Sequence, residues 1–368
     1  MRESVRKTGE RFMVGFDGFE ASRDVKRMIR EYGVGHVILF ARNVDSPEQV
    51  AELVRELQEC ARDAGFALPL LVAVDQEGGR VARMRRPWTE WAPLAALGRT
   101  GDEGLSRRMG AALAREMAAC GIRLDFAPVM DVHTNAANPI INDRAFGEDP
   151  ALVARLGAAM IRGFQDEGVA ACAKHFPGHG DTDLDSHHAL PVVSHDRRRL
   201  EEVELAPFRA AIEADVATMM TVHALIQELD DTLPATLSPK IVRGVLRGEL
   251  GYRGVVVSDD LEMKAVFERW KPEESAVLAA KAGCDILPLC SESHDHQVDA
   301  IEAVVRALET EEIPFTDMDD ACGRIQKMKE RFLLPYRPPD PRVARQTAGT
   351  GEHVALAHEI AERGGFAL

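Results

Sequence analysis

One stretch of fifteen residues, 174–188, holds the chain's densest group of side chains that can exchange protons or bind a ligand. It contains four of the twelve histidines and three aspartates, interrupted by Pro177, Gly178 and Gly180. The apolar run 169–173 leads into it and predicts a short buried strand whose carboxyl end opens into a loop. Because titratable side chains on such a loop have few purely structural uses, we predict a catalytic or ligand-binding loop.

Two side chains in this stretch are suited to proton transfer. Asp185 and His187 are separated by one residue, so in an extended segment they project to the same side. The carboxylate could then hold one ring nitrogen, favour the imidazolium and leave the other nitrogen free to give or take a proton. The pair alone leaves open a solvated loop with incidental histidines. Asp181 and Asp183 add carboxylates to which we assign no role.

A second candidate carboxylate follows a run of three valines at 255–257. The run predicts a strand, so the next residues, Ser258, Asp259 and Asp260, stand at its carboxyl end. A carboxylate there can act as a nucleophile, a base or a metal ligand. Helix capping by any of the three residues is the open alternative. One aspartate can cap the turn while the other points toward the centre of the fold.

Short apolar runs alternate with longer amphipathic segments along most of the chain. This order predicts a single α/β fold of the (β/α)8 barrel type. An open doubly wound sheet would more often show a G-x-G-x-x-G fingerprint after its first strand, and this chain has none there. The predicted strands are 12–16, 36–40, 70–74, 122–127, 169–173, 217–222, 254–257 and 285–289. The predicted helices are 24–31, 47–64, 102–120, 150–167, 200–214, 238–250, 275–282, 297–309 and 317–332.

Polar side chains gather where the predicted strands end, which is where such barrels carry their active sites. These groups are Asp75, Gln76 and Glu77, then Asp131, then Lys174 and His175, then His223, then Ser258, Asp259 and Asp260. The net charge of the chain is −15, so cations beside these ends suggest recognition of a polar substrate. The cations are Arg80, Arg83, Arg144 and Lys174.

Composition narrows the classes of function. The acidic charge argues against a nucleic-acid partner, and the absence of a long apolar run or a leader-like segment argues against a membrane protein. The six cysteines are scattered without paired spacing, which is typical of a reduced cytoplasmic protein and not of a zinc site. We expect no metal, no cofactor, and a monomer.

Four motifs together give a family resemblance. In order, they are DQEGGRV at 75–81, KHFPGHG at 174–180, DSH at 185–187 and SDDLEM at 258–263. The combination resembles the bacterial β-N-acetylhexosaminidases of glycoside hydrolase family 3 over residues 10–335. The resemblance implies that Asp259 is the nucleophile and that Asp185 and His187 form the acid/base dyad. It also implies substrate contacts from Asp75, Arg83, Arg144, Lys174, His175 and His223.

The implied reaction is removal of terminal β-linked N-acetylglucosamine, from peptidoglycan fragments, by a retaining exo-enzyme. Asp259 would attack the anomeric carbon while His187 protonates the leaving oxygen, and neutral His187 would then activate water. Gly178 and Gly180 would let the loop swing to deliver His187 when sugar is bound. The only expected partner is a small carbohydrate.

We divide the chain into a catalytic barrel, 1–335, and a segment, 336–368, made of a Pro-rich linker and a terminal helix over 352–363. Many family members carry a second α/β domain after the barrel. The terminal helix resembles the lead-in to that domain, and the rest of it is expected to be absent. Activity should survive, because the barrel supplies every residue implied above.

Other functions stay open on sequence alone. A related phosphorylase would use phosphate in place of water, and a histidine acid/base avoids a second anion that would repel it. Addition of phosphate and a search for sugar 1-phosphate would separate the two. A β-glucosidase, a metal-dependent barrel hydrolase using His175, His179, Asp185 and His187, and a non-catalytic sugar-binding protein are the remaining alternatives.

Overall fold

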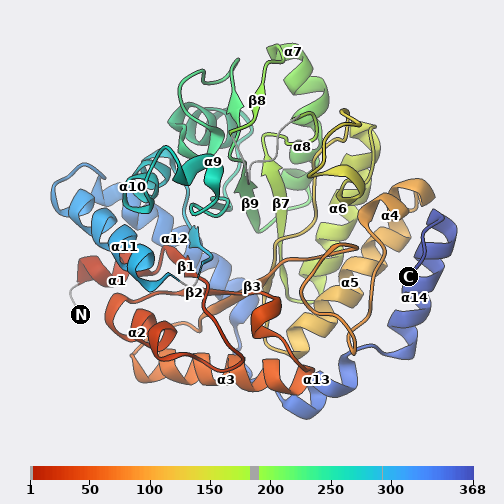
Figure 1. Ribbon diagram of the computed structural model, residues 1–368, viewed down its shortest axis with the longest axis horizontal. Coiled ribbons are helices and arrows are strands. Elements are labelled where there is room, and N and C mark those ends of the chain that lie inside the picture. Colours follow the sequence, from red (N-terminus) through yellow and green to blue (C-terminus); the bar gives the residue numbers. More distant parts are fainter. Residues whose placement is uncertain (1–2, 183–189, 292) are drawn as a thin grey trace.

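The computed structural model describes residues 3–182, 190–291 and 293–368. At its centre lies an eight-stranded parallel sheet with the order β11-β9-β7-β6-β3-β2-β1-β12 (Figure 1). A further parallel bridge between Val257 and Ile286 joins the two ends of this order. The sheet is therefore closed into a (β/α)8 barrel, which confirms the predicted fold. In the described residues, no helix is long and apolar enough to cross a membrane.

Every barrel strand overlaps one of the predicted strands. The strands are β1 (Phe12–Val14), β2 (His36–Leu39), β3 (Leu71–Val74), β6 (Leu124–Asp125), β7 (Ala170–Phe176), β9 (Thr218–Thr221), β11 (Val255–Val257) and β12 (Leu287–Leu289). Two short pairs lie outside the barrel: antiparallel β4 (Gln76–Gly78) with β5 (Val81–Ala82), and parallel β8 (Val192–Val193) with β10 (Leu225–Ile226). The first pair belongs to the loop after β3.

The barrel is surrounded by helices. They include α2 (Arg23–Tyr32), α3 (Pro47–Asp63), α5 (Glu103–Ala119), α6 (Pro150–Asp166), α8 (Ala206–Glu213), the helix Lys240–Glu249, α10 (Pro272–Ala282), α11 (His294–Glu309) and α12 (Phe315–Leu333). Local signals fix their starts. Ser46 and Asp149 accept a backbone N–H at the first turns of α3 and α6, and each helix begins with proline. Such a cap contributes about 1 kcal/mol, and the fixed φ of proline suits the first helical position.

Side-chain alternation along the strands separates the barrel interior from the outer layer. In β3, Leu71 and Ala73 belong to the inner apolar cluster, whereas Val72 and Val74 belong to the cluster shared with the helices. The inner cluster also includes Ile325, Met328, Phe332 and Leu333 of α12. The carboxyl half of α12 therefore closes the amino-terminal end of the barrel, and the opposite end remains for a site.

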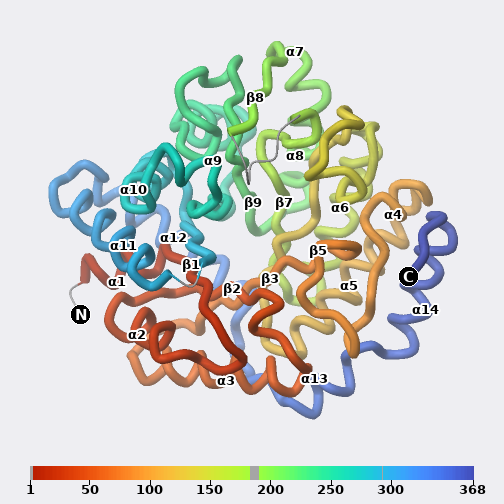
Figure 2. Tube along the Cα trace, in the orientation of Figure 1, coloured from red at the N-terminus to blue at the C-terminus, as the bar shows by residue number. Residues whose placement is uncertain are grey.

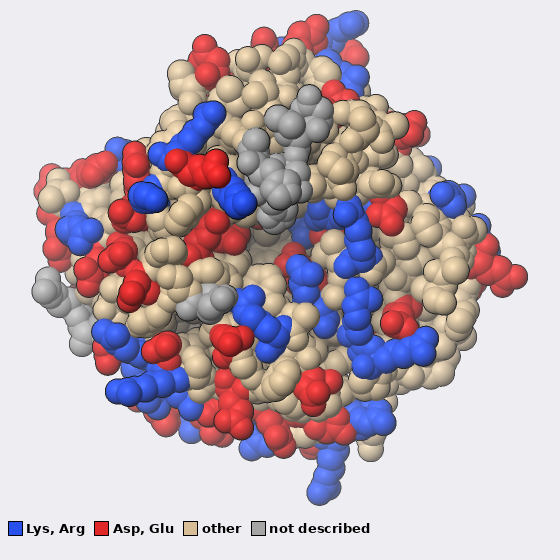
Figure 3. All heavy atoms as spheres, in the orientation of Figure 1, with Lys and Arg blue, Asp and Glu red and all other residues tan. Residues whose placement is uncertain are grey.

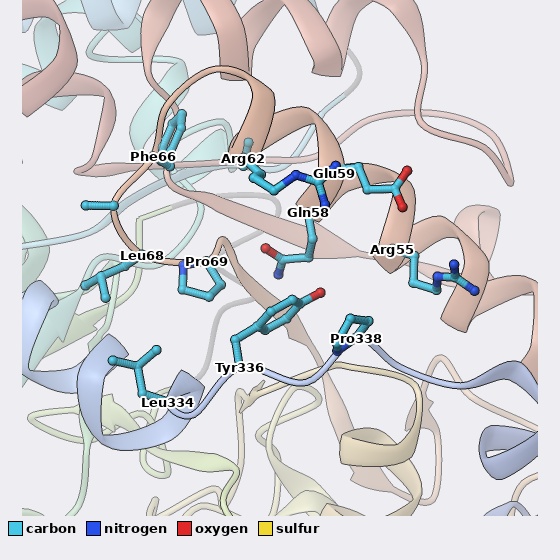
Figure 4. A pocket seen from close by; sticks show the side chains of 12 residues that line it. Arg55, Gln58, Glu59, Arg62, Phe66, Leu68, Pro69, Leu334, Tyr336 and Pro338 are labelled. Atoms are coloured by element: carbon cyan, nitrogen blue, oxygen red, sulfur yellow. The ribbon is translucent and has the colours of Figure 1, made fainter.

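After α12 the chain runs along the outside of the barrel helices (Figure 2). It forms α13 (Pro341–Thr347), which packs on α3, and α14 (Gly351–Gly364), which packs on α5 and on α4 (Leu94–Thr100). Where this segment passes α3 it borders a hollow of about 240 Å³ (Figure 4). The hollow lies beside the residues that precede β3, away from the carboxyl ends of the strands. Its apolar lining includes Phe66, Leu68, Pro69, Leu334, Tyr336 and Pro338.

Asp285, just before β12, is the shared counter-ion of two arginines. Its buried carboxylate accepts hydrogen bonds from the Val256 N–H (2.8 Å), Arg247 (2.7 Å) and Arg324 (2.9 Å). Arg324 lies on α12, so the ion pairs connect the closing helix to β11 and to the strand that follows it. Both guanidiniums are mostly shielded from water, with side-chain exposures of 14% and 25%.

Replacement of Asp285 by alanine should lower the free energy of unfolding by about 3–5 kcal/mol, because two shielded guanidiniums lose their counter-ion. The measurement is urea-induced unfolding followed by circular dichroism. Asp319→Ala, on α12 together with Arg324, is the control. That carboxylate is 60% exposed and pairs only with Lys7 among the described residues, so its loss should cost less than about 1 kcal/mol. Equal losses in the two variants would contradict this account of Asp285.

Candidate active site

A cavity of about 220 Å³ lies at the carboxyl end of the barrel strands. Figure 3 shows a hollow near the centre of this face, with lysines and arginines gathered along one side and acidic side chains on the other. Polar side chains from the carboxyl end of β7 and from the loops after β3, β6, β7 and β11 line the cavity: Asp75, Glu77, Arg83, Arg144, Lys174, His175, His179, Asp259 and Asp260. Its apolar lining includes Ile38, Phe40, Phe126, Met220, Met263 and Pro288.

Glu77 is the centre of a buried charge network. Its Oε1 lies 2.6 Å from the Lys174 Nζ and 2.8 Å from the Arg144 Nη2, and its Oε2 accepts the Arg144 Nε at 2.9 Å. Lys174 also contacts Asp75 at 3.0 Å, and Arg83 approaches the other oxygen of Asp75 at 3.5 Å. The network thus joins groups from three different strand ends.

The side chains of this network keep one another ionised. Burial alone would favour the neutral carboxyl, but Arg144 and Lys174 hold the pKa of Glu77 well below its usual range. Burial likewise disfavours the ammonium of Lys174, yet Glu77 and Asp75 raise its pKa above the ordinary value. Lys174 and Glu77 are therefore both ionised at neutral pH, and together they fix a hydrogen-bonding surface on one wall of the cavity.

Asp131 organises the histidines after β7. Its carboxylate accepts the backbone N–H groups of His175 (3.2 Å) and His179 (2.7 Å), and its Oδ2 lies 2.7 Å from the His175 Nδ1. Thr182 Oγ1 lies 2.7 Å from the His179 Nδ1. Burial and the neighbouring His175 lower the pKa of His179 to about 4. His179 is therefore neutral at pH 7, and its buried Nε2 has no hydrogen-bond partner among the described residues.

The two aspartates after β11 have different environments. Burial raises the pKa of Asp259, but His223, His175 and the Asp260 N–H outweigh it, so the net pKa lies below the ordinary value. Asp260 accepts the N–H groups of Glu262 (3.1 Å) and Cys290 (3.2 Å), and burial together with Glu262 raises its pKa to about 7. Asp259 is therefore ionised throughout the neutral range, whereas Asp260 changes its charge within that range.

The predicted site residues fall into three groups. Asp75, Arg83, Arg144, Lys174, His175 and Asp259 line the one cavity. His223 is buried behind it, where its Nε2 lies 2.8 Å from the Asp260 carbonyl oxygen and its Nδ1 lies 2.9 Å from the Thr236 hydroxyl. Asp185 and His187 lie outside the described residues, as does Asp183.

Sequence reasoning gave no role to Glu77 or Asp131, and it left open which of Asp259 and Asp260 caps the turn. A signal for Glu77 was present: it stands two positions after Asp75, and side chains at that spacing in an extended segment point to the same side. Asp131 was noted only as polar, because nothing in the sequence pairs it with His175. In the part of the chain that the structure describes, no group of three or more His, Cys, Asp or Glu side chains is arranged to hold a metal ion.

Comparison with known proteins adds to this geometry. The family model for the glycosyl hydrolase family 3 N-terminal domain matches residues 5–328. The chain belongs to glycosyl hydrolase family 3. A family relative, the β-hexosaminidase of Alkalilimnicola ehrlichii, is 40% identical over 83% of this chain and 86% of its own length. β-Hexosaminidase A of Pseudoalteromonas piscicida is 35% identical over 92% of this chain, which spans only 60% of that relative.

Solved structures of the family superpose closely. A family 3 β-N-acetylglucosaminidase from Paenibacillus sp. FPU-7 has a TM-score of 0.93 and 42% identity, covering 99% of this chain and 69% of its own. NagZ from Neisseria gonorrhoeae, in complex with N-trifluoroacetyl-D-glucosamine, has a TM-score of 0.78 and 30% identity, covering 96% of this chain and 98% of its own. Within the family, the chain belongs to the β-hexosaminidases, a group of glycoside hydrolases.

Asp125, at the end of β6, is a buried carboxyl beneath the charge network. Its Oδ1 accepts the Gln76 N–H at 2.9 Å, and its Oδ2 has no hydrogen-bond partner among the described residues. Burial, with a further contribution from Asp75 and Glu77, raises its pKa to about 8 and outweighs the opposing effects of the Gln76 N–H and Lys174. The native state therefore keeps a proton on Asp125 at pH values where the unfolded chain has released it.

This retained proton predicts how stability varies with pH. Between about pH 4 and about pH 8, Asp125 is ionised in the unfolded chain but stays protonated in the native state, so a rise in pH favours unfolding. Wild type should lose about 1.4 kcal/mol of stability per pH unit from this group, and Asp125→Asn should not. Urea unfolding of both proteins at four pH values measures the difference. If the stability of Asp125→Asn varied with pH as that of wild type does, the assignment would be contradicted. The control is Asp231→Asn, at an exposed position, whose stability should follow the wild-type dependence on pH.

Proposed function

We propose that the chain is a retaining exo-β-N-acetylhexosaminidase that releases terminal β-linked N-acetylglucosamine. The observation that carries the proposal is an ionised Asp259 in the lining of a small cavity that is also lined by the ionised Lys174–Glu77 pair. A cavity of about 220 Å³ is of the size of one sugar ring with its substituents and not of a long polymer. The relatives named β-hexosaminidase and β-N-acetylglucosaminidase support the choice of sugar.

Asp259 acts as the nucleophile in this proposal. It attacks the anomeric carbon, the bond to the leaving oxygen breaks, and a covalent glycosyl-enzyme forms. The neighbouring Asp260 N–H donates to its Oδ1 at 2.9 Å, which holds the carboxylate in place. His223 supports the same turn from β9 by its contact with the Asp260 carbonyl oxygen. A nucleophile held by its own backbone turn loses little entropy on attack.

His187 acts as the acid/base in this proposal, with Asp185 as the carboxylate that favours its charged form. Imidazolium His187 gives its proton to the departing glycosidic oxygen. In the second step neutral His187 takes a proton from water, which attacks the anomeric carbon and releases Asp259. Two displacements at one carbon retain the anomeric configuration. This mechanism requires no cofactor, because the carboxylate supplies the nucleophile, the imidazole transfers the protons and water supplies the hydroxyl group of the product.

The charge network around Glu77 binds the sugar in this proposal. Lys174 and Arg83 both contact Asp75, and Glu77 joins Arg144 to Lys174, so the donors and acceptors of this network are oriented before substrate arrives. Hydroxyl groups that bind between them gain charge-assisted hydrogen bonds without further ordering of the side chains. The His175 ring is held by Asp131 in the same way. The acetamido group would then face the apolar side of the cavity.

Peptidoglycan fragments in the cytoplasm are the proposed natural substrates. Their lactyl and peptide carboxylates are anionic, and cationic side chains gather on one side of the hollow (Figure 3). In this proposal the enzyme is a monomer, with residues 1–335 as the catalytic barrel and 336–368 as a linker and terminal helix.

The nucleophile can be tested with a nitrophenyl N-acetyl-β-glucosaminide. Asp259→Ala should lower kcat by about 10⁴-fold or more, because the covalent intermediate cannot form. Added azide should restore turnover and give the α-configured glycosyl azide, which nuclear magnetic resonance identifies. Asp231→Ala, at an exposed position, is the matched control and should match wild type. Full activity in Asp259→Ala would show that Asp259 is not the nucleophile.

The acid/base can be tested by the choice of leaving group. His187→Ala should slow hydrolysis of alkyl glycosides by at least tenfold more than that of activated nitrophenyl glycosides, since only the former need a proton as they depart. The measurement is kcat/KM for both substrate classes in parallel. His358→Ala, on the exposed face of α14, is the control. Equal effects of His187→Ala on the two classes would rule out the assigned role.

A further inference from the structure

A buried carboxylate links the C-terminal segment to the loop that carries Arg83. Glu116 lies on α5, and its oxygens accept four hydrogen bonds from two other parts of the chain. The Thr89 N–H (3.1 Å) and hydroxyl (2.6 Å) come from the loop between β5 and α4. The Gly349 N–H (3.1 Å) and the His353 Nδ1 (2.8 Å) come from the turn before α14 and from α14 itself.

The contact between these two segments is close as well as polar. Gly349 has a φ of +60°, and a Cβ there would meet the Pro87 carbonyl oxygen at 2.2 Å. The turn between α13 and α14 therefore lies directly on the residue that precedes Trp88. Trp88 and Thr89 are 3% and 2% exposed, and Glu116 and His353 are equally enclosed. A carboxylate and its partners this deeply buried cannot exchange their hydrogen bonds for water without cost.

A second attachment lies at the other end of α14. A Cβ on Gly364 would meet Ala96 of α4 at 2.7 Å, and the Arg99 Nη1 donates to the Gly364 carbonyl oxygen at 3.1 Å. The Arg99 guanidinium also lies 4.3 Å from the centre of the Phe366 ring. Since α4 begins directly after the loop, α14 holds the loop both at Thr89 and at the helix that follows it.

The same loop leads back to the cavity. The Gln76 Oε1 accepts the N–H groups of Arg83 (2.8 Å) and Met84 (3.0 Å), and its Nε2 donates to the Met84 carbonyl oxygen at 2.9 Å. The Gly79 N–H donates to the Trp91 carbonyl oxygen at 2.8 Å. Hydrogen bonds therefore tie the loop that contains Thr89 to Gln76 and Gly79, the residues that flank Glu77 and follow Asp75.

We propose that Glu116 and His353 are positioning residues for the substrate site. Through Thr89 they keep the loop of residues 83–93 in the place where Arg83 meets Asp75 in the cavity. The role of Arg83 in binding sugar rests on the function proposed above; the mechanical link does not. Asp259 and the loop after β7 are attached to other strands, so the clamp acts on substrate binding far more than on the chemical step.

The test compares three variants that break the clamp from three sides: Glu116→Ala, Gly349→Ala and His353→Ala. We expect each to raise KM for the nitrophenyl glycoside by about tenfold while kcat stays within about threefold, because a group displaced by about an ångström weakens binding. Circular dichroism and the unfolding midpoint establish that each protein is folded at the assay temperature. His358→Ala, exposed on the same helix, is the control and should leave both constants unchanged.

A second readout does not depend on catalysis. Trp88 and Trp91 are two of the three tryptophans, so in a Trp270→Phe background all tryptophan fluorescence, excited at wavelengths that tyrosine does not absorb, comes from this loop. The clamp variants should make this fluorescence more accessible to acrylamide, and His358→Ala should not. A lower unfolding midpoint with unchanged KM and unchanged quenching would show that the clamp is merely structural and would overturn the proposal. If wild type hydrolyses no glycoside, the proposed function fails and quenching alone decides the positioning role.

Discussion

The pairing of Lys174 with Glu77 is the constraint on which the site depends. Both side chains are nearly inaccessible to water, at 2% and 1% exposure, and neither charge could remain there alone. Arg144 completes the set by binding both oxygens of Glu77. A buried pair of this kind adds little to stability relative to an apolar core, but loss of one member leaves an uncompensated charge. The network therefore fixes geometry, because the end of β7 and the loops after β3 and β6 must meet at one carboxylate.

The barrel brings these groups together by strand alternation. Asp75 and Glu77 both line the cavity, whereas Gln76 between them turns away and holds the backbone of Met84. Gly78 and Gly79 then reverse the chain with φ values of +101° and +57°, which side chains rarely adopt. The hairpin of β4 and β5 is thus built from one short motif, with site residues on one side and the loop's support on the other.

The sequence predicted the barrel because its strands are short, buried apolar runs with polar residues at one end. The cavity-lining residues Asp75, Lys174 and Asp259 were found for the same reason, since each follows such a run directly. Glu116, Asp131 and His353 were not found. Their partners lie 27 or more residues away in the chain, as with Glu116 and Thr89, and no periodicity records such pairings. The roles assigned to Asp185 and His187 stay predictions.

The site combines fixed charges with carboxyl groups whose charge changes near neutral pH, and Asp260 is the one that adjoins Asp259. Lys174, Glu77 and Asp259 keep their charges through the neutral range, whereas burial and Glu262 raise the pKa of Asp260 to about 7. Above that pH a second negative charge develops next to Asp259. In the proposed mechanism, this charge would repel the free Asp259 carboxylate and favour its conversion to a neutral ester. The proposed attack by Asp259 would then depend on pH through Asp260, its neighbour in the turn after β11.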